Sequence, residues 1–487
     1  MIVRRHPKDV GKAVGWIVAD RVDSLPGLGR KLPHYSKYSY LGFEGAEPTN
    51  MLKGQWATSD SPLTADARAE ADRQTPLPAF AVPAGPPLAT LPPVFSEQTL
   101  REHIDRLTSS RFEGRGIGTR GLDRAAEYLA AQFERIGLAP GAGGDSYLQT
   151  FETTRTPDGR PATLANVVGV IPGSEPSWRG QSVLLTAHYD HLGMGWPDPR
   201  RGDEGTLHPG ADDNASGVAA MLEVARALAA SGAARRTVVV IAFTGEDAGL
   251  IGSRHYVEHP VLPRDGIRAI VNLDSVGRLG SGQIGVLGAG TATEWPHVFR
   301  GIGFVTGIQT QLAQEALPAS DQASFAAAGI PGVQLFTPPH ADYHRPTDTA
   351  DKIDVGGLVK VATVAREAIA YLADRPEPLT ATIGGPATTS TPQPSGNKPA
   401  RRAGLGLIPE FGFSGPGVKA SGLVPGSPAE KAGMRAGDVL LEVAGTTLAS
   451  LRAYSDVLKT LAPGQAVPVV FERDGRRHQA SVVLADR

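Results

Sequence analysis

The sequence predicts an α/β fold, with a mixed, mostly parallel central sheet, helices on both of its faces, and a small mainly-β domain after it. Apolar β-branched runs alternate with amphipathic runs through the middle of the chain, which is typical of such sheets. The 487 residues are too many for one core, and 41% hydrophobic with 20% charged residues is a globular composition. We therefore expect several domains, one of them built on this sheet.

The elements of the α/β domain follow from the period of its apolar residues. Strands are expected at 165–171, 182–187, 237–243, 268–273 and 332–336. Helices are expected at 120–136, which Gly137 ends, and at 215–231, 251–257, 321–328 and 355–372. Ligands of such sheets bind beyond the carboxyl ends of the strands, so polar residues at those ends are the first candidates for a site.

Two segments rich in proline divide the chain, because proline restricts φ and favours an extended linker. The expected parts are an N-terminal extension of unknown role, a Pro-rich linker, the α/β domain, a flexible linker and the small domain, at 1–74, 75–97, 98–375, 376–400 and 401–487. Within the extension, residues 8–24 have helical apolar spacing, which predicts a short helix there.

Composition excludes several classes of protein. The net charge of −2 argues against a general nucleic-acid binder, whose surface would be basic. The absence of cysteine excludes disulfides, thiolate zinc sites and cysteine nucleophiles, and it fits a bacterial protein exported to the periplasm or the medium.

No run approaches the ~20 apolar residues of a transmembrane helix. No signal peptide is visible after the basic first residues, so either the protein is not exported or Met1 is not its natural start.

Seven polar side chains lie at or near the ends of predicted strands. They are His188 and Asp190 in T-A-H-Y-D-H, Asp213 in G-A-D-D-N-A-S-G, Glu246 and Asp247 in T-G-E-D-A-G, Asp274 in V-N-L-D-S, and His344 in D-Y-H-R-P. Each alone has an ordinary explanation, since a strand-end histidine is usually structural and Asp213 could cap the following helix. Asp212 or Asn214 could also fill the cap and leave Asp213 free.

Together these residues predict a metal centre. Two histidines and three carboxylates are a hard, mixed N/O set that suits two zinc ions, with Mn²⁺ or Co²⁺ as possible substitutes. One shared carboxylate gives each ion three protein ligands, and the pair can hold a hydroxide and polarise a carbonyl. Glu246, beside Asp247, is the candidate general base. Asp190 follows His188 by two residues and is placed to hold that imidazole in one tautomer.

At these residues the chain resembles the co-catalytic two-zinc exopeptidases of the aminopeptidase S and aminopeptidase Y kind, relatives of glutamate carboxypeptidase. The resemblance covers about residues 98–375. Its motifs are L-T-S-S-R-F-E-G-R-G-I-G-T-R-G, G-E-D-A-G-L-I-G-S and D-Y-H-R-P-T-D-T-A-D-K-I.

The resemblance implies a role for each residue. It places His188 and Asp274 on one metal, Asp247 and His344 on the other, and Asp213 between them, with Glu246 as base and Asp190 behind His188. Tyr343 matches a tyrosine that holds the oxyanion in some relatives, although a packed loop aromatic is an equal alternative. The chain departs from many relatives at Asp247, where they have glutamate, and at Gln322, where they often have histidine.

Residues 401–487 resemble a PDZ domain. The motifs are G-L-G-L (404–407), V-P-G-S-P-A-E-K-A-G-M-R-A-G-D-V-L-L-E-V-A-G (424–445) and F-E-R-D-G-R-R (471–477). Gly404, Leu405, Gly406 and Leu407 would accept a peptide carboxylate, and the next strand edge would take the peptide as an added strand. Alternatively, the domain only packs against the peptidase or aids assembly.

The predicted function is that of a zinc metallopeptidase, an aminopeptidase that hydrolyses N-terminal residues by a hydroxide held between two zinc ions, with Glu246 as base. The alternatives are a non-catalytic scaffold of the same fold, a carboxypeptidase, and a glutaminyl cyclase. A scaffold would lack ligands, and a cyclase with one zinc would leave His188 and Asp274 superfluous. Partners are expected to be peptide or protein substrates and a C-terminal peptide on the PDZ domain.

Overall fold

The computed structural model describes residues 94–383 apart from 233 and 315–319, residues 403–486 apart from 411, 412 and 414, and short stretches between 2 and 54. The chain divides into a small unit, Met1–Pro93 with Gly303–Gly307, and a large unit that holds the rest. Most of the two predicted linkers, at 75–93 and 384–400, lies outside the described residues. The predicted domain boundaries therefore stay predictions.

The N-terminal stretch forms a four-stranded antiparallel sheet, in the order β2-β1-β3-β4. Its elements are β1 (Ile2–His6), β2 (Asp9–Trp16), α1 (Leu25–Lys31), β3 (Tyr40–Glu44) and β4 (Thr49–Gly54). The predicted helix over 8–24 is thus wrong, because Asp9–Trp16 is a strand that pairs with β1. Valine and glycine recur in this segment and are poor helix formers, so pairing with a neighbouring strand outweighs a weak helical period.

The α/β domain is built on a nine-stranded sheet, in the order β12-β11-β13-β10-β8-β9-β7-β5, with β6 paired to β7. The strands are β5 (Ala139–Pro140), β6 (Leu148–Thr153), β7 (Ala162–Ile171), β8 (Ser182–His188), β9 (Thr237–Phe243), β10 (Ile267–Leu273), β11 (Ile284–Leu287), β12 (Thr310–Ala313) and β13 (Gly332–Phe336). The four central strands β13, β10, β8 and β9 are parallel. Toward the edges, β7 pairs antiparallel to β9, and β5 and β6 pair antiparallel to β7. At the other edge β11 pairs antiparallel to β13 but parallel to β12. The mixed sheet is confirmed, but the expectation of a mostly parallel one holds only in part, at the centre and for the β11–β12 pair.

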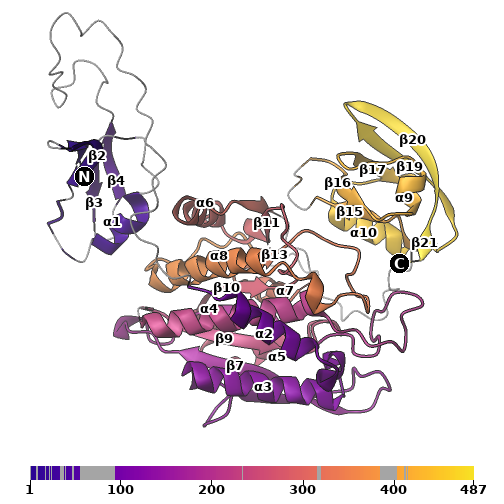
Figure 1. Ribbon diagram of the computed structural model, residues 1–487, viewed down its shortest axis with the longest axis horizontal. Helices are drawn as coiled ribbons and strands as arrows, with labels where there is room; N and C mark the ends of the chain where they lie inside the picture. The colour runs from indigo at the N-terminus through magenta and orange to yellow at the C-terminus, as the bar shows by residue number, and fades with distance from the viewer. Residues whose placement is uncertain are drawn as a thin grey trace, which may run out of the picture. The chain divides into compact units, whose positions relative to one another are not determined.

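Helices lie on both faces of this sheet (Figure 1). They are α2 (Glu97–Thr108), α3 (Arg120–Ile136), α4 (Gly217–Ser231), α5 (Ile251–Glu258), α6 (Trp295–Thr306), α7 (Gln322–Ala327) and α8 (Val355–Asp374). Successive strand residues point to opposite faces. On β8, Val183 and Leu185 join the core under α4 and α8, whereas Leu184 joins the core with Tyr256 of α5 and Phe325 of α7. No helix in the described parts of the chain is long and apolar enough to cross a membrane.

The C-terminal domain is a small β-rich fold with its own core. Its elements are β14 (Ala403–Gly404), β15 (Leu407–Pro409), β16 (Val418–Leu423), α9 (Pro428–Lys431), β17 (Val439–Val443), β18 (Thr446–Thr447), α10 (Leu451–Lys459), β19 (Ala466–Arg473), β20 (Arg476–Val483) and β21 (Ala485–Asp486). The main sheet runs β15-β16-β17-β19-β20. Ser427 caps α9, because its side chain accepts from the N–H of Glu430, and Pro428 begins the helix. Leu405, Val418 and Tyr454 of α10 are among its buried residues.

Candidate metal centre

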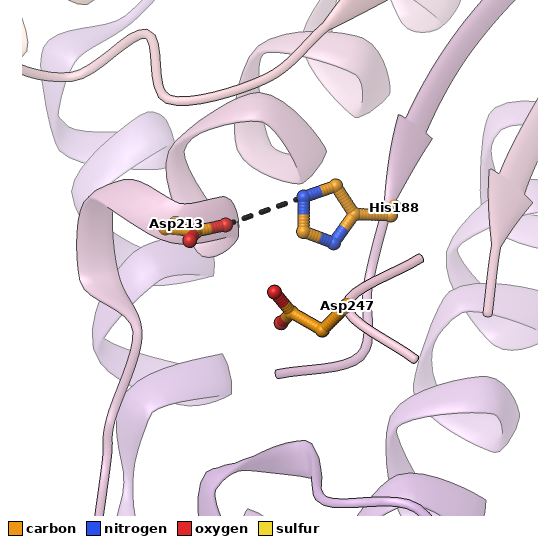
Figure 2. A group of neighbouring side chains, drawn as sticks. All are labelled: His188, Asp213 and Asp247. Atoms are coloured by element: carbon orange, nitrogen blue, oxygen red, sulfur yellow. Dashed lines mark ion pairs between the residues drawn. The ribbon is translucent and has the colours of Figure 1, made fainter. Parts of the chain in front are cut away.

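Five of the seven predicted side chains converge at the carboxyl ends of the central strands, each from a different segment. His188 is the last residue of β8, Asp213 lies in the turn before α4, Asp247 follows β9, Asp274 follows β10, and His344 lies in the loop before α8. Figure 2 shows three of them, His188, Asp213 and Asp247, with their polar ends turned toward one another. One ligand atom from each of these three lies within 4.8 Å of the other two.

Asp213 stands between the two histidines and turns one oxygen toward each. Its Oδ1 lies 3.3 Å from His188 Nε2, which is also 3.5 Å from Asp274 Oδ1. Its Oδ2 lies 3.1 Å from His344 Nε2, which is also 3.2 Å from Asp247 Oδ1. The five residues therefore form two sets of three that share Asp213.

These separations fit metal ligands. Zinc bonds to N and O of about 2.0–2.2 Å place two ligands of a tetrahedral ion about 3.3–3.5 Å apart, close to the observed spacings. Although the buried His344 Nε2 is this close to two carboxylate oxygens, it forms a hydrogen bond with neither of them, nor with any other described residue. Burial opposes the ionisation of Asp213, but contact with His188 and His344 holds its pKa well below the ordinary value. An ionised, bridging carboxylate between two imidazoles is a donor set that suits zinc.

The side chain of Asp213 does not cap helix α4. Asn214 serves the start of the helix instead, because its Oδ1 accepts from the N–H of Gly217 at 3.1 Å. The Nδ2 of Asn214 also donates to Leu273 O at 2.9 Å. The backbone N–H groups of Asp212 and Asp213 donate to Asp348 Oδ2 at 2.8 and 3.1 Å. These contacts fix the turn, so the side chain of Asp213 needs no local partner.

Glu246 lies beside the five residues in a protected position, with only 9% of its surface exposed. Burial raises its pKa well above the ordinary value; the neighbouring Asp247 and Asp274 add to the shift and His188 opposes it. Its backbone N–H donates to Asp190 Oδ1 at 3.1 Å. Asp190 Oδ1 is 3.7 Å from His188 Nδ1, which is too long for a hydrogen bond. Asp190 is thus hydrogen-bonded to the backbone of Glu246 and lies only near the imidazole of His188.

The two remaining residues singled out near the site have different surroundings. The ring of Tyr343 stacks on His344, with centroids 4.0 Å apart and planes at 18°. This contact fits the packed-aromatic alternative, and a role with the oxyanion stays a prediction. Gln322 is buried in a chain of amides, since its Oε1 accepts from Asn272 at 3.1 Å and its Nε2 donates to Gln334 at 3.1 Å.

Sequence reasoning missed Arg115, which is fully buried at the base of the site. Its guanidinium donates to four carbonyl oxygens, those of Leu107, Tyr189, Pro209 and Gly210, at 2.8–2.9 Å. Tyr189 lies between His188 and Asp190, and the Pro209–Gly210 segment leads into Asp213. One arginine thereby connects two segments that carry site residues. The only signal in the sequence was a basic residue among glycines in E-G-R-G.

His191 was also missed, although it lies in the motif T-A-H-Y-D-H. It is almost fully buried, and its Nδ1 lies 3.2 Å from Asp247 Oδ2. A second histidine so close to a ligand motif could have been found by its spacing alone.

In the C-terminal domain, the predicted peptide-binding residues 404–407 span the end of β14 and the start of β15. Gly406 has a φ of +72°, where a side chain would also meet Ser427, so glycine is required there. Leu405 is fully buried in the core. Gly404 pairs with Ala485 of β21. A peptide-binding role for these residues stays a prediction.

Comparison with known proteins agrees with both domains. Residues 166–369 match the model of peptidase family M28, and residues 420–473 match the model of the PDZ domain. Leupeptin-inactivating enzyme 1 of Streptomyces exfoliatus is 30% identical over 280 residues, which are 56% of this chain and 56% of that protein. Aminopeptidase YwaD of Bacillus subtilis is 30% identical over 203 residues, 38% of this chain and 40% of that one. The chain thus spans about half the length of the curated relatives that it matches.

Solved structures of zinc exopeptidases also match. The zinc aminopeptidase BSAP from Bacillus subtilis is 19% identical with a TM-score of 0.47, over 60% of this chain and 97% of that chain. A Zn-dependent exopeptidase from Parabacteroides distasonis is 20% identical with a TM-score of 0.48, over 58% of this chain and 99% of that chain.

Proposed function

We propose that the protein is a two-zinc exopeptidase that removes N-terminal residues from peptides, because residues 166–369 match the model of peptidase family M28 and residues 420–473 match that of the PDZ domain. Relatives named as an aminopeptidase and as zinc metalloproteases support the reaction and the metal. We propose further that the enzyme is of the aminopeptidase S and aminopeptidase Y kind.

One observation carries the proposal, namely that Asp213 directs its two oxygens to two different histidines. His188 and Asp274 complete one set of three donors, and Asp247 and His344 complete the other. A carboxylate between two nitrogen donors can bridge two cations, whereas a single-metal site would need only one of its oxygens. The shared donor therefore favours two ions, each with three protein ligands.

The residues of the chain then have distinct tasks in peptide hydrolysis. When bound, the metal ions supply Lewis acidity toward the attacking water and the scissile carbonyl. Glu246 takes the proton of that water and delivers it to the leaving amine; burial raises its pKa, which makes the carboxylate a stronger base toward the water. Asp190 holds the backbone of Glu246 and so fixes the base beside the ligands.

The names of the relatives support removal of residues from the N-terminal end of the peptide, and the choice of substrate tests it. An aminopeptidase hydrolyses amino-acid anilides with a free amine and leaves N-blocked peptides intact, whereas a carboxypeptidase does the reverse. Zinc content measured on the same preparation should be two ions per chain. Cleavage of N-blocked peptides alone would replace the aminopeptidase by a carboxypeptidase, and cleavage of neither substrate class would favour a scaffold.

The base is tested by Glu246→Gln, which keeps the shape of the side chain and removes its proton affinity. We expect kcat to fall by about 10²–10⁴-fold with bound zinc unchanged. Glu258→Gln, at an exposed position at the end of α5, is the matched control and should leave both unchanged. Activity retained in Glu246→Gln would exclude the residue from the role of base.

For the PDZ domain we propose that it binds peptides along β15, the outer strand of its main sheet, with α10 as the other wall of the groove, and that it delivers polypeptide chains to the peptidase. The edge of a strand can accept a peptide as an added strand.

A further inference from the structure

His191 contacts the metal centre but belongs to neither set of donors described above. Its Nδ1 lies 3.2 Å from Asp247 Oδ2 and 3.9 Å from Asp213 Oδ2. His344 faces the opposite oxygen of Asp247, Oδ1, at 3.2 Å. The carboxylate of Asp247 is therefore held between two imidazoles, one on each oxygen.

The ring of His191 is fixed from several sides. Its backbone N–H donates to Arg115 O at 3.1 Å. Gly210, with a φ of +56°, passes so close that a Cβ there would come within 2.4 Å of the ring carbon Cδ2. The rings of His208 and His344 meet it edge-on, with centroids 6.4 and 5.8 Å away. The imidazole cannot turn away, so Nδ1 stays directed at Asp247.

The surroundings of the two ring nitrogens of His191 determine which of them carries the proton in the neutral imidazole. Among the described residues, the buried Nε2 of His191 has no hydrogen-bond partner. A proton on Nε2 would be an orphaned buried donor, which is rarer and costlier than an unpaired acceptor. A proton on Nδ1 would instead be donated to Asp247 Oδ2 over 3.2 Å, an ordinary hydrogen-bond length.

We propose that His191 is a positioning residue for the metal site of Asp247 and His344, in which its Nδ1–H fixes Asp247 Oδ2 and turns Oδ1 to the ion. The proposal rests on the two-zinc function above. Direct ligation by His191 is disfavoured because its 3.9 Å distance from Asp213 exceeds the spacing of about 3.3–3.5 Å between ligands of a tetrahedral ion. A partner of this kind fixes the orientation of a ligand and thereby its metal affinity.

The test measures metal affinity in the full-length protein rather than activity. In His191→Leu, zinc competition with a chelator should show one ion bound as in the wild type and the other weakened by about 10–100-fold. His191→Asn places an amide N–H near the position of Nδ1 and should restore the weakened site to within about threefold of the wild type. His191→Ala repeats the loss if leucine does not fit. His259→Leu, at an exposed histidine, is the control and should bind as the wild type does.

The outcomes separate this inference from the proposed function. Two ions bound with wild-type affinity in both His191→Leu and His191→Ala would overturn the positioning role and leave the peptidase intact. Failure of His191→Asn to restore binding, together with a cobalt spectrum that has lost one nitrogen ligand, would make His191 a ligand and also overturn it. A wild-type protein that binds fewer than two ions would instead contradict the two-zinc function itself.

Discussion

Replacing Arg115 by methionine should destabilise the α/β domain strongly and loosen the metal site. The substitution keeps an unbranched side chain but leaves four carbonyl oxygens without their donor, three of them in fully buried contacts. At about 2 kcal/mol for each unsatisfied group, the loss is about 8 kcal/mol. Burial lowers the pKa of Arg115 to about 10, so removing the charge returns about 3 kcal/mol. The expected net loss is about 5 kcal/mol of unfolding free energy.

Urea denaturation followed by tryptophan fluorescence measures this loss. The chain has five tryptophans, none in residues 403–486, and Trp295 is fully buried in the α/β domain. Arg160→Met, at a side chain that is 85% exposed, is the control and should change stability by less than about 0.5 kcal/mol. Zinc should also bind more weakly in Arg115→Met, because the carbonyl groups of Tyr189 and Gly210 lose their hydrogen bonds to the guanidinium. A loss below about 1 kcal/mol with unchanged zinc affinity would refute the reasoning.

Three further predictions concern other parts of the molecule. His188→Ala should lower bound zinc from two ions to one, and an unchanged metal-to-protein ratio would argue against its assignment as a ligand. Asp438→Asn should destabilise the C-terminal domain by about 2 kcal/mol, because Arg473 contacts both carboxylate oxygens at 2.7 Å. Burial opposes ionisation of Asp438, but Arg473 lowers its pKa, so this stabilisation is present above about pH 4 and fades as the pH falls further. Hydrogen exchange of the backbone amides in β17 and β19 measures both the loss in the variant and the pH dependence. Protection in Asp438→Asn equal to that of the wild type at neutral pH would contradict the predicted loss of stability. Deletion of 401–487 should slow cleavage of long polypeptides but not of dipeptide-sized substrates, and unchanged rates on both would remove the delivery role.

The central fold was predictable because its signals are strong and local. The strands at 237–243 and 332–336 are observed with the predicted ends, and helix α3 spans the predicted 120–136 and ends at Gly137. A run of buried β-branched residues or a complete amphipathic helix leaves few alternatives. The periodicity of residues 8–24 predicts a helix where the structure has the strand Asp9–Trp16, because the fold of a short segment with weak periodicity is decided by the strand that pairs with it.

The site was predictable only as a set of residue types. Strand ends meet at one edge of a parallel sheet, so His188, Asp247 and Asp274 could be placed together before their distances were known. The contribution of Arg115 could not be predicted, because its four acceptors are backbone carbonyl oxygens, which every residue has. The spacing in T-A-H-Y-D-H marks His191 as a candidate, but its contact with Asp247 could not be predicted, because the two residues are 56 positions apart and no pattern in the sequence pairs them.

The most direct test of the account is a crystal structure with diffraction measured at the zinc absorption edge. The account predicts two anomalous peaks, one among His188, Asp213 and Asp274 and one among Asp213, Asp247 and His344. A single peak, or none within reach of Asp213, would contradict a two-zinc centre at these residues.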